Sequence, residues 1–237
     1  MSIKKKIVAI TVLTALYFIL SSQNTGGTIK KNGQVYNPDG IEMVYVEGSG
    51  SGIYGINGFY IGKYPITQKE WKAVMGGANP SKFKDDDNPV ENVSWLDVQE
   101  FIKRLNRLTG RSYRLPTESE WDYAAKGGSL SRGYIYSGSN NLDEVAWYRD
   151  NSYGRTHKVG SKKPNELGIY DMNGNVWEWT ENCYDGTYDS RVLCGGSYFW
   201  DTSGNSIAFR LKRVNRHGVV SDVGGVVGDY YGFRLVL

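Results

Sequence analysis

The segment GIYDMNGNVWEWTEN, residues 168–182, concentrates side chains that could bind a hard cation. Asp171, Asn173, Asn175 and Glu178 place oxygen donors close together in the chain, and the Asn-Gly pair among them predicts a turn that exposes backbone carbonyls. Ca²⁺ is bound by six to eight such oxygens. The segment therefore predicts a calcium loop. The alternative is a tight turn held by Asx hydrogen bonds without a metal.

Side chains for nucleophilic or redox chemistry are scarce. The chain has two cysteines, Cys183 and Cys194, which in an exported protein form either a disulfide or a pair of buried thiols. The only histidines, His157 and His217, show no metal-ligand spacing, so each is expected at the surface or hydrogen-bonded. No Gly-x-Ser-x-Gly motif and no phosphate loop occurs. The sequence thus indicates neither a catalytic residue nor a redox cofactor.

The N-terminus predicts export. Residues 1–22 combine a lysine-rich start with an apolar run over 7–20, which is typical of a signal peptide and short for a membrane-spanning helix. Residues 20–22 look like the start of a lipoprotein cleavage box, but Gln23 stands where the lipidated cysteine would be. Residues 23–34 are predicted to be a flexible tether. We expect a cell-surface or outer-membrane location, with membrane contact only through the N-terminal segment.

Length and composition favour a single loop-rich domain over residues 35–237. The whole chain has 237 residues, with 30 glycines and 18 tyrosines, and no internal repeat is evident. The net charge is +3, and beyond the N-terminus the positive residues are mixed with acidic ones. A nucleic-acid-binding protein would show a basic stripe, so no nucleic-acid partner is expected.

Hydrophobic periodicity predicts few regular elements. In chain order they are strands over 41–48 and 59–67, a short helix over 68–75, main helices over 92–110 and 115–128, and a terminal strand over 231–237. In the first main helix the apolar face comprises Val98, Phe101, Ile102, Leu105 and Leu108. Ser94 and Thr117 are expected N-caps, and Gly110 and Gly127 are expected stops. Residues 129–237 show no helical period and are expected to form loops and short strands.

Several longer motifs occur in a characteristic order. These are GIEMVYVEG, FYIGKYPITQKEW, NPVENVSWLDVQEF, YRLPTESEWDYAAKGG, VGSKKPNELGIYDMNGNVWEWT, RVLCGGSY and the closing GFRLV. Over residues 40–237 they resemble the formylglycine-generating-enzyme, or sulfatase-modifying-factor, domain. The resemblance implies an α+β C-type-lectin-like fold with two main helices, short strands, high loop content, and paired N- and C-terminal strands.

The resemblance also implies how a calcium ion would be bound. The ligands would be the side chains of Asp171 and Glu178 and the backbone carbonyls of Gly174 and Val176. Trp177 and Trp179, which flank Glu178, are expected in the core, because this fold has few long strands from which to build one.

The catalytic cysteines of the resembled oxidases are missing. Those enzymes use a cysteine pair just after the GGS segment to bind copper and the substrate thiol. Here residues 195–210 contain no cysteine, and both cysteines of the chain precede them. Other side chains cannot supply the thiolate chemistry. We therefore expect a protein that is not an enzyme. The alternatives are an oxidase or related enzyme, and an adhesin or structural domain with a fixed partner.

The segment between residues 198 and 231 has an unusual composition. It lacks Glu, Gln and Met, and it contains Trp and Lys once each. No codon that ends in a pyrimidine encodes any of these five amino acids, so randomised Asn-type codons would produce this depletion. The alternative is ordinary drift in a loop rich in glycine and valine. Variable proteins of diversity-generating retroelements carry a similar segment near the C-terminus of such a domain, ending near GFR.

This resemblance implies a surface that binds a protein or other macromolecule. Tyr, Ser, Gly and Asn suit such a surface because they make adaptable contacts at low entropic cost. Tyr198 is expected to belong to the scaffold. The residues expected to face the ligand are Phe199, Asp201, Thr202, Ser203, Asn205, Ser206, Arg213, Asn215, His217, Ser221, Asp222, Asp229, Tyr230 and Tyr231.

Overall fold

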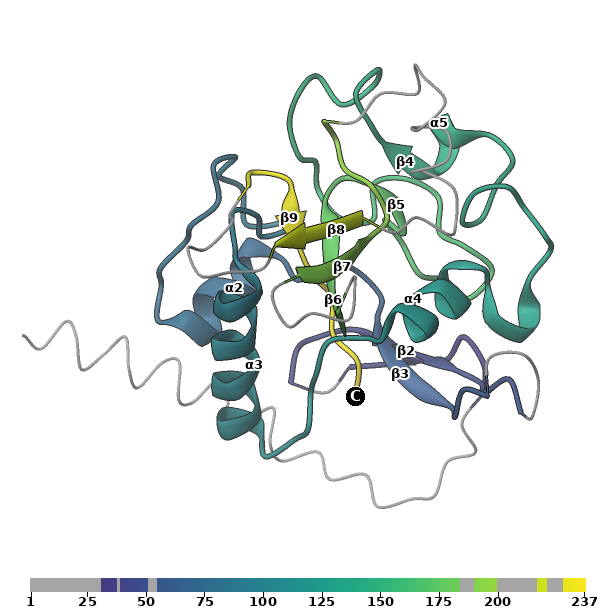
Figure 1. Ribbon diagram of the computed structural model, residues 1–237, viewed down its shortest axis with the longest axis horizontal. Helices are drawn as coiled ribbons and strands as arrows, with labels where there is room; N and C mark the ends of the chain where they lie inside the picture. Colours follow the sequence, from purple (N-terminus) through teal and green to yellow (C-terminus); the bar gives the residue numbers. More distant parts are fainter. Residues whose placement is uncertain (1–30, 38, 51–54, 184–189, 200–216, 221–227) are drawn as a thin grey trace, which may run out of the picture.

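The computed structural model describes residues 31–37, 39–50, 55–183, 190–199, 217–220 and 228–237. The helical elements are α2 (Gln68–Met75), α3 (Trp95–Thr109), α4 (Glu118–Ala125), η1 (Gly128–Leu130) and α5 (Leu142–Val145). The strands are β1 (Val35–Tyr36), β2 (Met43–Val46), β3 (Phe59–Gly62), β4 (Ala146–Trp147), β5 (Asn173–Gly174), β6 (Trp177–Cys183), β7 (Ser190–Cys194), β8 (His217–Val220) and β9 (Tyr231–Gly232). Short strands and long connections confirm the expected α+β class (Figure 1).

The two ends of the domain pair with each other. Strands β1, β2 and β3 form an antiparallel sheet. The last residues of the chain run along β3, where the Gly62 N–H donates to the Leu235 carbonyl at 2.8 Å and the Leu237 N–H donates to the Tyr60 carbonyl at 3.0 Å. The expected pairing of N- and C-terminal strands is therefore confirmed, and Figure 1 shows the C-terminus beside β2 and β3.

A four-stranded sheet in the order β8-β7-β6-β9 forms the centre of the domain. Strand β6 runs antiparallel to β7 and parallel to β9. The register places Cys183 opposite Arg191 and Cys194 opposite Glu178, so the two cysteines lie at different positions along the ladder. Neither cysteine forms a disulfide in this structure. Of the two alternatives, the structure therefore supports thiols rather than a disulfide.

The domain begins a few residues earlier than expected. Residues 31–34 were assigned to the tether, yet the Gly33 N–H donates to the Tyr45 carbonyl at 2.8 Å. The Asn32 amide also donates to the Ser129 hydroxyl at 2.8 Å. These contacts attach the segment to β2 and to η1, which corrects the boundary. No helix among the residues that the structure describes is long and apolar enough to cross a membrane.

Local capping signals set the helix boundaries. Ser94 and Thr117 each form a capping box, with Asp97 and Glu120 respectively. The α3 helix ends at Gly110, whose φ of 69° is the left-handed conformation that favours glycine. Leu108 was expected on the buried face of α3, but its side chain is 48% exposed. It lies in the last turn, beyond the part of α3 that packs on the core.

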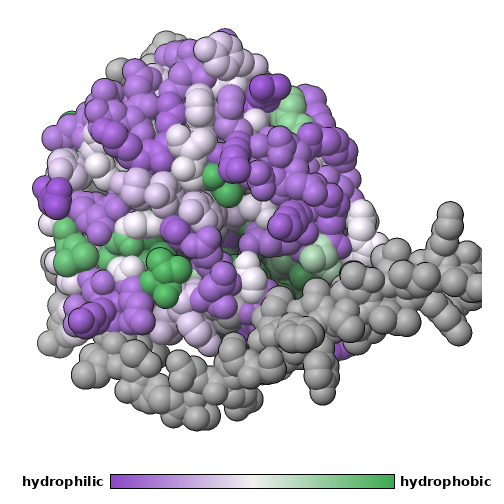
Figure 2. All heavy atoms as spheres, turned by 180° about the vertical axis from the view of Figure 1, so that it is seen from behind, coloured by the Kyte–Doolittle hydropathy of each residue, from purple (hydrophilic) through white to green (hydrophobic). Residues whose placement is uncertain are grey.

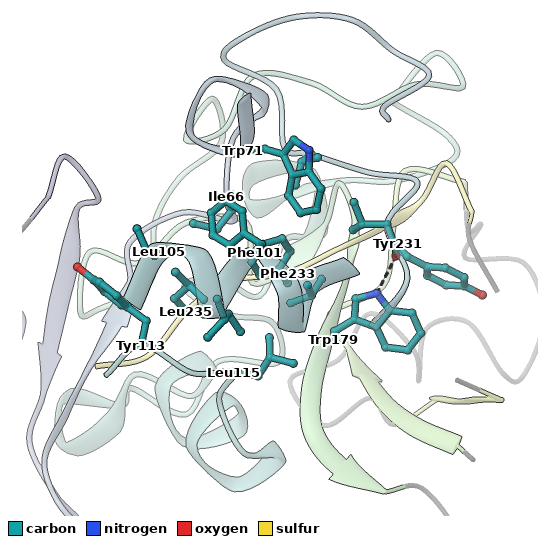
Figure 3. Close-up of a cluster of buried hydrophobic side chains, with 14 of the residues drawn as sticks. Ile66, Trp71, Phe101, Leu105, Tyr113, Leu115, Trp179, Tyr231, Phe233 and Leu235 are labelled. Carbon is teal, nitrogen blue, oxygen red and sulfur yellow. Dashed lines mark hydrogen bonds between the residues drawn. The ribbon is translucent and has the colours of Figure 1, made fainter. Parts of the chain in front are cut away.

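The core is rich in aromatic side chains. In the larger cluster, Trp71 stacks on Phe101 with ring centroids 5.2 Å apart, and Phe233 packs edge-on against both rings (Figure 3). Trp177 and Trp179 are fully buried, as expected, and the Trp179 indole donates to the Val93 carbonyl at 3.0 Å. By contrast, the face in Figure 2 is mostly hydrophilic, with apolar residues gathered in a narrow band.

A buried ion pair connects the C-terminal segment to the rest of the domain. Arg234 donates from Nε and Nη2 to the two carboxylate oxygens of Glu178, each at 2.6 Å, and both side chains have no exposed surface. The guanidinium also donates to the carbonyls of Gly62 at 3.0 Å and Tyr170 at 2.9 Å. The Trp121 indole donates to Glu178 at 2.7 Å. The pair is thus almost completely satisfied by buried partners.

Arg234→Met should lower the free energy of unfolding by about 3–5 kcal/mol, because it leaves the Glu178 carboxylate buried without a cation. Arg104→Met is the matched control, since the Arg104–Glu100 pair is solvent-exposed and its loss should cost less than about 1 kcal/mol. Chemical denaturation measures both. The double variant Arg234→Met/Glu178→Leu should recover part of the loss. Equal unfolding free energies of Arg234→Met and Arg104→Met would contradict this assignment.

Candidate ligand-binding site

The segment proposed for calcium forms a structural corner. Asp171 and Asn175 adopt left-handed backbone conformations with φ of 55° and 62°, and Gly174 between them has φ of 74°. A Cβ atom at Gly174 would lie 2.1 Å from the Trp147 carbonyl oxygen, so only glycine fits. The Asn175 side chain exchanges hydrogen bonds, each 3.0 Å long, with the N–H and carbonyl of His157. The corner therefore fixes the loop that contains His157.

The donor set of this corner matches calcium only in part. Asp171, Gly174, Val176 and Glu178 are all buried. Arg234 donates to both carboxylate oxygens of Glu178. The positive charge that a metal ion would bring to Glu178 is therefore already supplied by the guanidinium. An ion at these residues would have to share Glu178 with Arg234. Within the described ranges, no group of three or more histidine, cysteine or acidic side chains is arranged to hold a metal.

No cationic side chain of the described residues forms an ion pair with Asp171. Its Oδ2 accepts the Gly160 N–H at 2.7 Å. Burial raises the pKa of this carboxyl to about 6, against the lowering effects of the Gly160 hydrogen bond, of nearby Arg234 and of Asn175. The carboxyl is therefore far easier to protonate in the folded protein than in water.

The scaffold holds both ends of the segment 198–231. Tyr198 is 2% exposed; its N–H donates to the Asn175 carbonyl at 2.9 Å, and its carbonyl accepts the Ser152 hydroxyl at 2.9 Å. At the other end, the Trp177 N–H donates to the Tyr230 carbonyl at 2.8 Å. The expectation that Tyr198 belongs to the scaffold is thus met. The segment leaves and re-enters the domain at fixed points.

Residues from the two ends of the segment meet at the surface. Phe199 is 58% exposed, and its ring stacks on Tyr230 with centroids 6.1 Å apart and planes 16° apart. Asp229 forms an ion pair with Lys82, which belongs to a scaffold loop. Phe83 of that loop packs edge-on against Tyr198 at 5.4 Å. Figure 1 shows this loop, between α2 and α3, beside the chain that leads into β9.

Tyr231 is not a ligand-facing residue. Its side chain is 7% exposed and packs against Trp179, with ring centroids 5.4 Å apart. Its backbone pairs with β6, which turns the ring inward and corrects the expectation. The backbone of His217 lies in β8. The remaining expected positions lie outside the described residues; they are Asp201, Thr202, Ser203, Asn205, Ser206, Arg213, Asn215, Ser221 and Asp222.

A polar cavity of about 380 Å³ lies next to this surface. Two scaffold loops line it, through Phe83, Lys84, Asp85, Asn88, Arg155, Thr156, His157 and Lys158. His157 stacks on Trp147 and its Nε2 lies 2.7 Å from the Ser152 carbonyl, so the expectation of a hydrogen-bonded histidine is met. Burial lowers the pKa of the His157 imidazole. The sequence analysis did not find this cavity.

A buried acidic residue, Glu91, holds the backbone of the loop that carries Phe83 by a hydrogen bond. Glu91 has no exposed surface, and its Oε1 accepts the Phe83 N–H at 2.9 Å. The Glu91 N–H in turn bonds to the Ser81 hydroxyl at 3.1 Å. Burial raises the pKa of the Glu91 carboxyl to about 7. Phe83 is therefore presented by a loop whose backbone is fixed from inside the domain.

Comparison with known proteins identifies the family. The Sulfatase-modifying factor enzyme 1-like domain matches residues 31–237, and the chain belongs to this family. Treponema denticola variable protein 1 has a similar structure, with a TM-score of 0.69 and 27% identity, covering 86% of this chain and 98% of that one. CarF has a TM-score of 0.67 and 25% identity, covering 83% of this chain and 97% of that one.

Two relatives are similar in sequence. Chaperone protein LppX of Paenibacillus barcinonensis is 38% identical over 205 residues, covering 64% of this chain and 72% of that protein. Inactive C-alpha-formylglycine-generating enzyme 2 of Bos taurus is 31% identical over 183 residues, covering 72% of this chain. The match spans 56% of the bovine protein, so the chain corresponds to just over half of its length.

Asp171→Asn should stabilise the protein at pH 7 in buffer that contains a chelator. The folded-state pKa of about 6 exceeds the usual 3.8, so wild-type stability should fall as the pH rises from about 4 to about 6. The loss approaches about 3 kcal/mol at pH 7. Asparagine can still accept the Gly160 N–H, and the difference between variant and wild type should vanish near pH 4. Denaturant titrations at several pH values measure this difference in unfolding free energy. If Asp171→Asn were less stable than the wild type at pH 7, the assignment would be contradicted.

We retain calcium at this corner as a proposal with a direct test. An ion that binds only the folded state stabilises it by about 2.7 kcal/mol at a hundredfold excess over Kd. A chelator should therefore lower the melting temperature of the wild type, and Asp171→Ala should remove most of that sensitivity. If the wild type melts at the same temperature with and without chelator, calcium has no structural role here.

Proposed function

We propose that this member of the sulfatase-modifying factor family is a non-catalytic binding protein whose ligand-binding surface is built from a diversified segment, residues 198–231. The observation that carries the proposal is the meeting of Phe199 and Tyr230. These residues lie at opposite ends of the segment, yet they stack on each other at the surface. Directly beside them, Tyr198 and Tyr231 are buried. Changeable side chains are thus presented on a fixed base.

The cysteine content supports a role without covalent chemistry. The cysteine pair that the family's oxidases use after the GGS segment has no counterpart in residues 195–210. Cys194 is buried in β7, and Cys183 lies opposite Arg191 at the far end of β6. A relative that is 31% identical is itself named inactive. Together these observations favour binding over thiol oxidation.

The exposed residues suit a macromolecular ligand. Phe199 and Lys82 are exposed and Tyr230 and Asp229 are partly buried; together they combine aromatic rings with a charged pair, a mixture typical of protein-binding surfaces. A solved structure with 27% identity bears the name variable protein, which supports diversification. The proposed ligand is a protein or other macromolecule outside the cell. Export and surface attachment rest on the sequence of residues 1–22, which precede the described part of the chain.

A binding protein of fixed specificity is the second candidate. A relative that is 38% identical is named a chaperone protein. Such a protein would also bind without catalysis, and it would use the same exposed surface. The two candidates differ in one respect: only a diversified surface should differ between closely related clones.

Sequencing this locus in many sibling clones tests the proposal. We expect substitutions concentrated in residues 199–230, with Tyr198, Tyr231 and Arg234 unchanged because they are buried. The flanking part of the same gene is the internal control for the background mutation rate. Substitutions spread evenly along the chain would reject diversification and leave the fixed-specificity candidate.

An oxidase assay tests the absence of catalysis. The purified full chain, incubated with copper and a cysteine-containing sulfatase peptide, should form no formylglycine above the buffer control, because no cysteine follows Cys194. Mass spectrometry of the peptide gives the readout. Robust copper-dependent turnover would contradict the assignment, and turnover that survives Cys183→Ser/Cys194→Ser would indicate a catalytic group other than these thiols.

A further inference from the structure

The cavity beside the variable surface is built entirely from scaffold residues. Its walls come from the loop around Phe83 to Asn88 and from the loop that contains Arg155 to Lys158. Hydrogen bonds join these loops: the Val159 N–H donates to the Asp87 carbonyl at 3.0 Å, and the Asn88 amide donates to the Thr156 carbonyl at 3.3 Å. Both walls lie outside residues 198–231, so diversification would leave this cavity unchanged.

We propose that this cavity is an invariant subsite for a single carboxylate, which accepts an aspartate or glutamate side chain of a protein ligand bound to the variable surface. The macromolecular context rests on the proposed function. The carboxylate specificity rests on the cavity itself. In this arrangement the fixed subsite provides an anchor that every variant shares, and residues 198–231 provide the discrimination among ligands.

The charges that line the cavity favour an anion. Lys84, Arg155 and Lys158 outnumber the single lining acid, Asp85. Lys158 is paired with Asp87, and the Lys84 ammonium donates to the Asn79 carbonyl. Within the described ranges, the exposed Arg155 side chain forms no hydrogen bond or ion pair. Its planar donor groups therefore remain available for a bidentate bond to a carboxylate.

The surrounding charges disfavour a polyanion. Asp85, Asp86 and Asp87 are exposed next to the cavity. Asp86 is paired with Lys72 and Asp87 with Lys158, so Asp85 is the carboxylate that would mainly repel the successive negative charges of a sulfated glycan or a nucleic acid. A single acidic side chain can reach Arg155 without this penalty. The local charge pattern therefore selects a protein side chain over an extended anionic polymer.

The loop beside Arg155 presents a second contact residue. Tyr153 is 88% exposed, and its backbone is held in the left-handed conformation at φ 56°. This conformation is costly for a tyrosine and persists only when the surrounding structure enforces it. Ser152 supplies that constraint, because its hydroxyl accepts the Gly154 N–H and donates to the Tyr198 carbonyl. Tyrosine and arginine are the residue types most often found at interface hot spots.

The subsite is continuous with the variable surface. Phe83 lines the cavity and also packs on Tyr198, whose neighbour Phe199 is exposed. Ser152 bonds to the backbone of Tyr198 and immediately precedes Tyr153. A protein that contacts Phe199 and Tyr230 can therefore place one acidic side chain in the cavity at the same time.

Nuclear magnetic resonance titration of the isotope-labelled full chain tests the proposal. The probe is acetyl-glutamate amide, and the neutral isostere acetyl-glutamine amide is its control. We expect saturable shifts of the Arg155, Thr156 and His157 signals with the glutamate probe, and at least about tenfold weaker binding of the glutamine probe. Arg155→Gln should abolish the difference between probes. Arg107→Gln, on the exposed face of α3, should leave it intact.

Three outcomes would overturn the proposal. The first is equal binding of the two probes, and the second is an unchanged response in Arg155→Gln. The third is preferential binding of a heparin-derived oligosaccharide at the same signals, which would indicate a polyanion site. None of these outcomes bears on whether residues 198–231 are diversified. Clone sequencing decides that question separately.

Discussion

The domain depends on the buried pair between Arg234 and Glu178. A buried charge is stable only when it is paired and hydrogen-bonded, and here one guanidinium bonds to a carboxylate and to two backbone carbonyls. Those partners belong to β6, to the end of β3 and to the loop before the corner. The chain that follows residues 198–231 must therefore return to one position.

This constraint separates folding from binding along the sequence. On the folding side, Tyr198 and Tyr231 are buried at the two junctions, and Phe233 packs into the aromatic cluster around Trp71 and Phe101. On the binding side, the proposed surface beside the junctions combines Phe199 and Tyr230 with Phe83 and Lys82 from the scaffold. A fixed base of this kind lets side chains change at the surface at little cost to the core.

Features with local causes could be predicted from the sequence. Each main helix begins at a capping box, and these signals lie within a few residues of the boundaries they set; α3 ends at Gly110 in a left-handed conformation, whereas α4 ends at Ala125, one residue before the right-handed Lys126 and two before the left-handed Gly127. The motif resemblance supplied the fold class. The burial of Trp177 and Trp179 could be predicted because a fold with few long strands needs such side chains for its core.

Features with tertiary causes could not be predicted in the same way. The oxygen-rich corner suggested a cation, and the cation that faces Glu178 is Arg234, which lies 56 residues later in the chain. Tyr231 follows the partly buried Asp229 and Tyr230, but pairing with β6 turns its own ring inward. The cavity combines Lys84 and Arg155 from loops that are far apart in the sequence, and no motif in either loop indicates that the two lie together.

The most direct test of the account is a saturation mutagenesis scan of residues 198–237, displayed on cells and sorted for protease resistance as a measure of folding. We expect that Phe199, which is exposed, accepts most substitutions, and that the partly buried Asp229 and Tyr230 accept more than the buried positions do. Tyr198, Tyr231, Phe233 and Arg234 should accept few, because these side chains are buried. If Phe199, Asp229 and Tyr230 proved as intolerant as the buried positions, residues 199–230 would be part of the folding core, and the separation of binding from folding would be wrong.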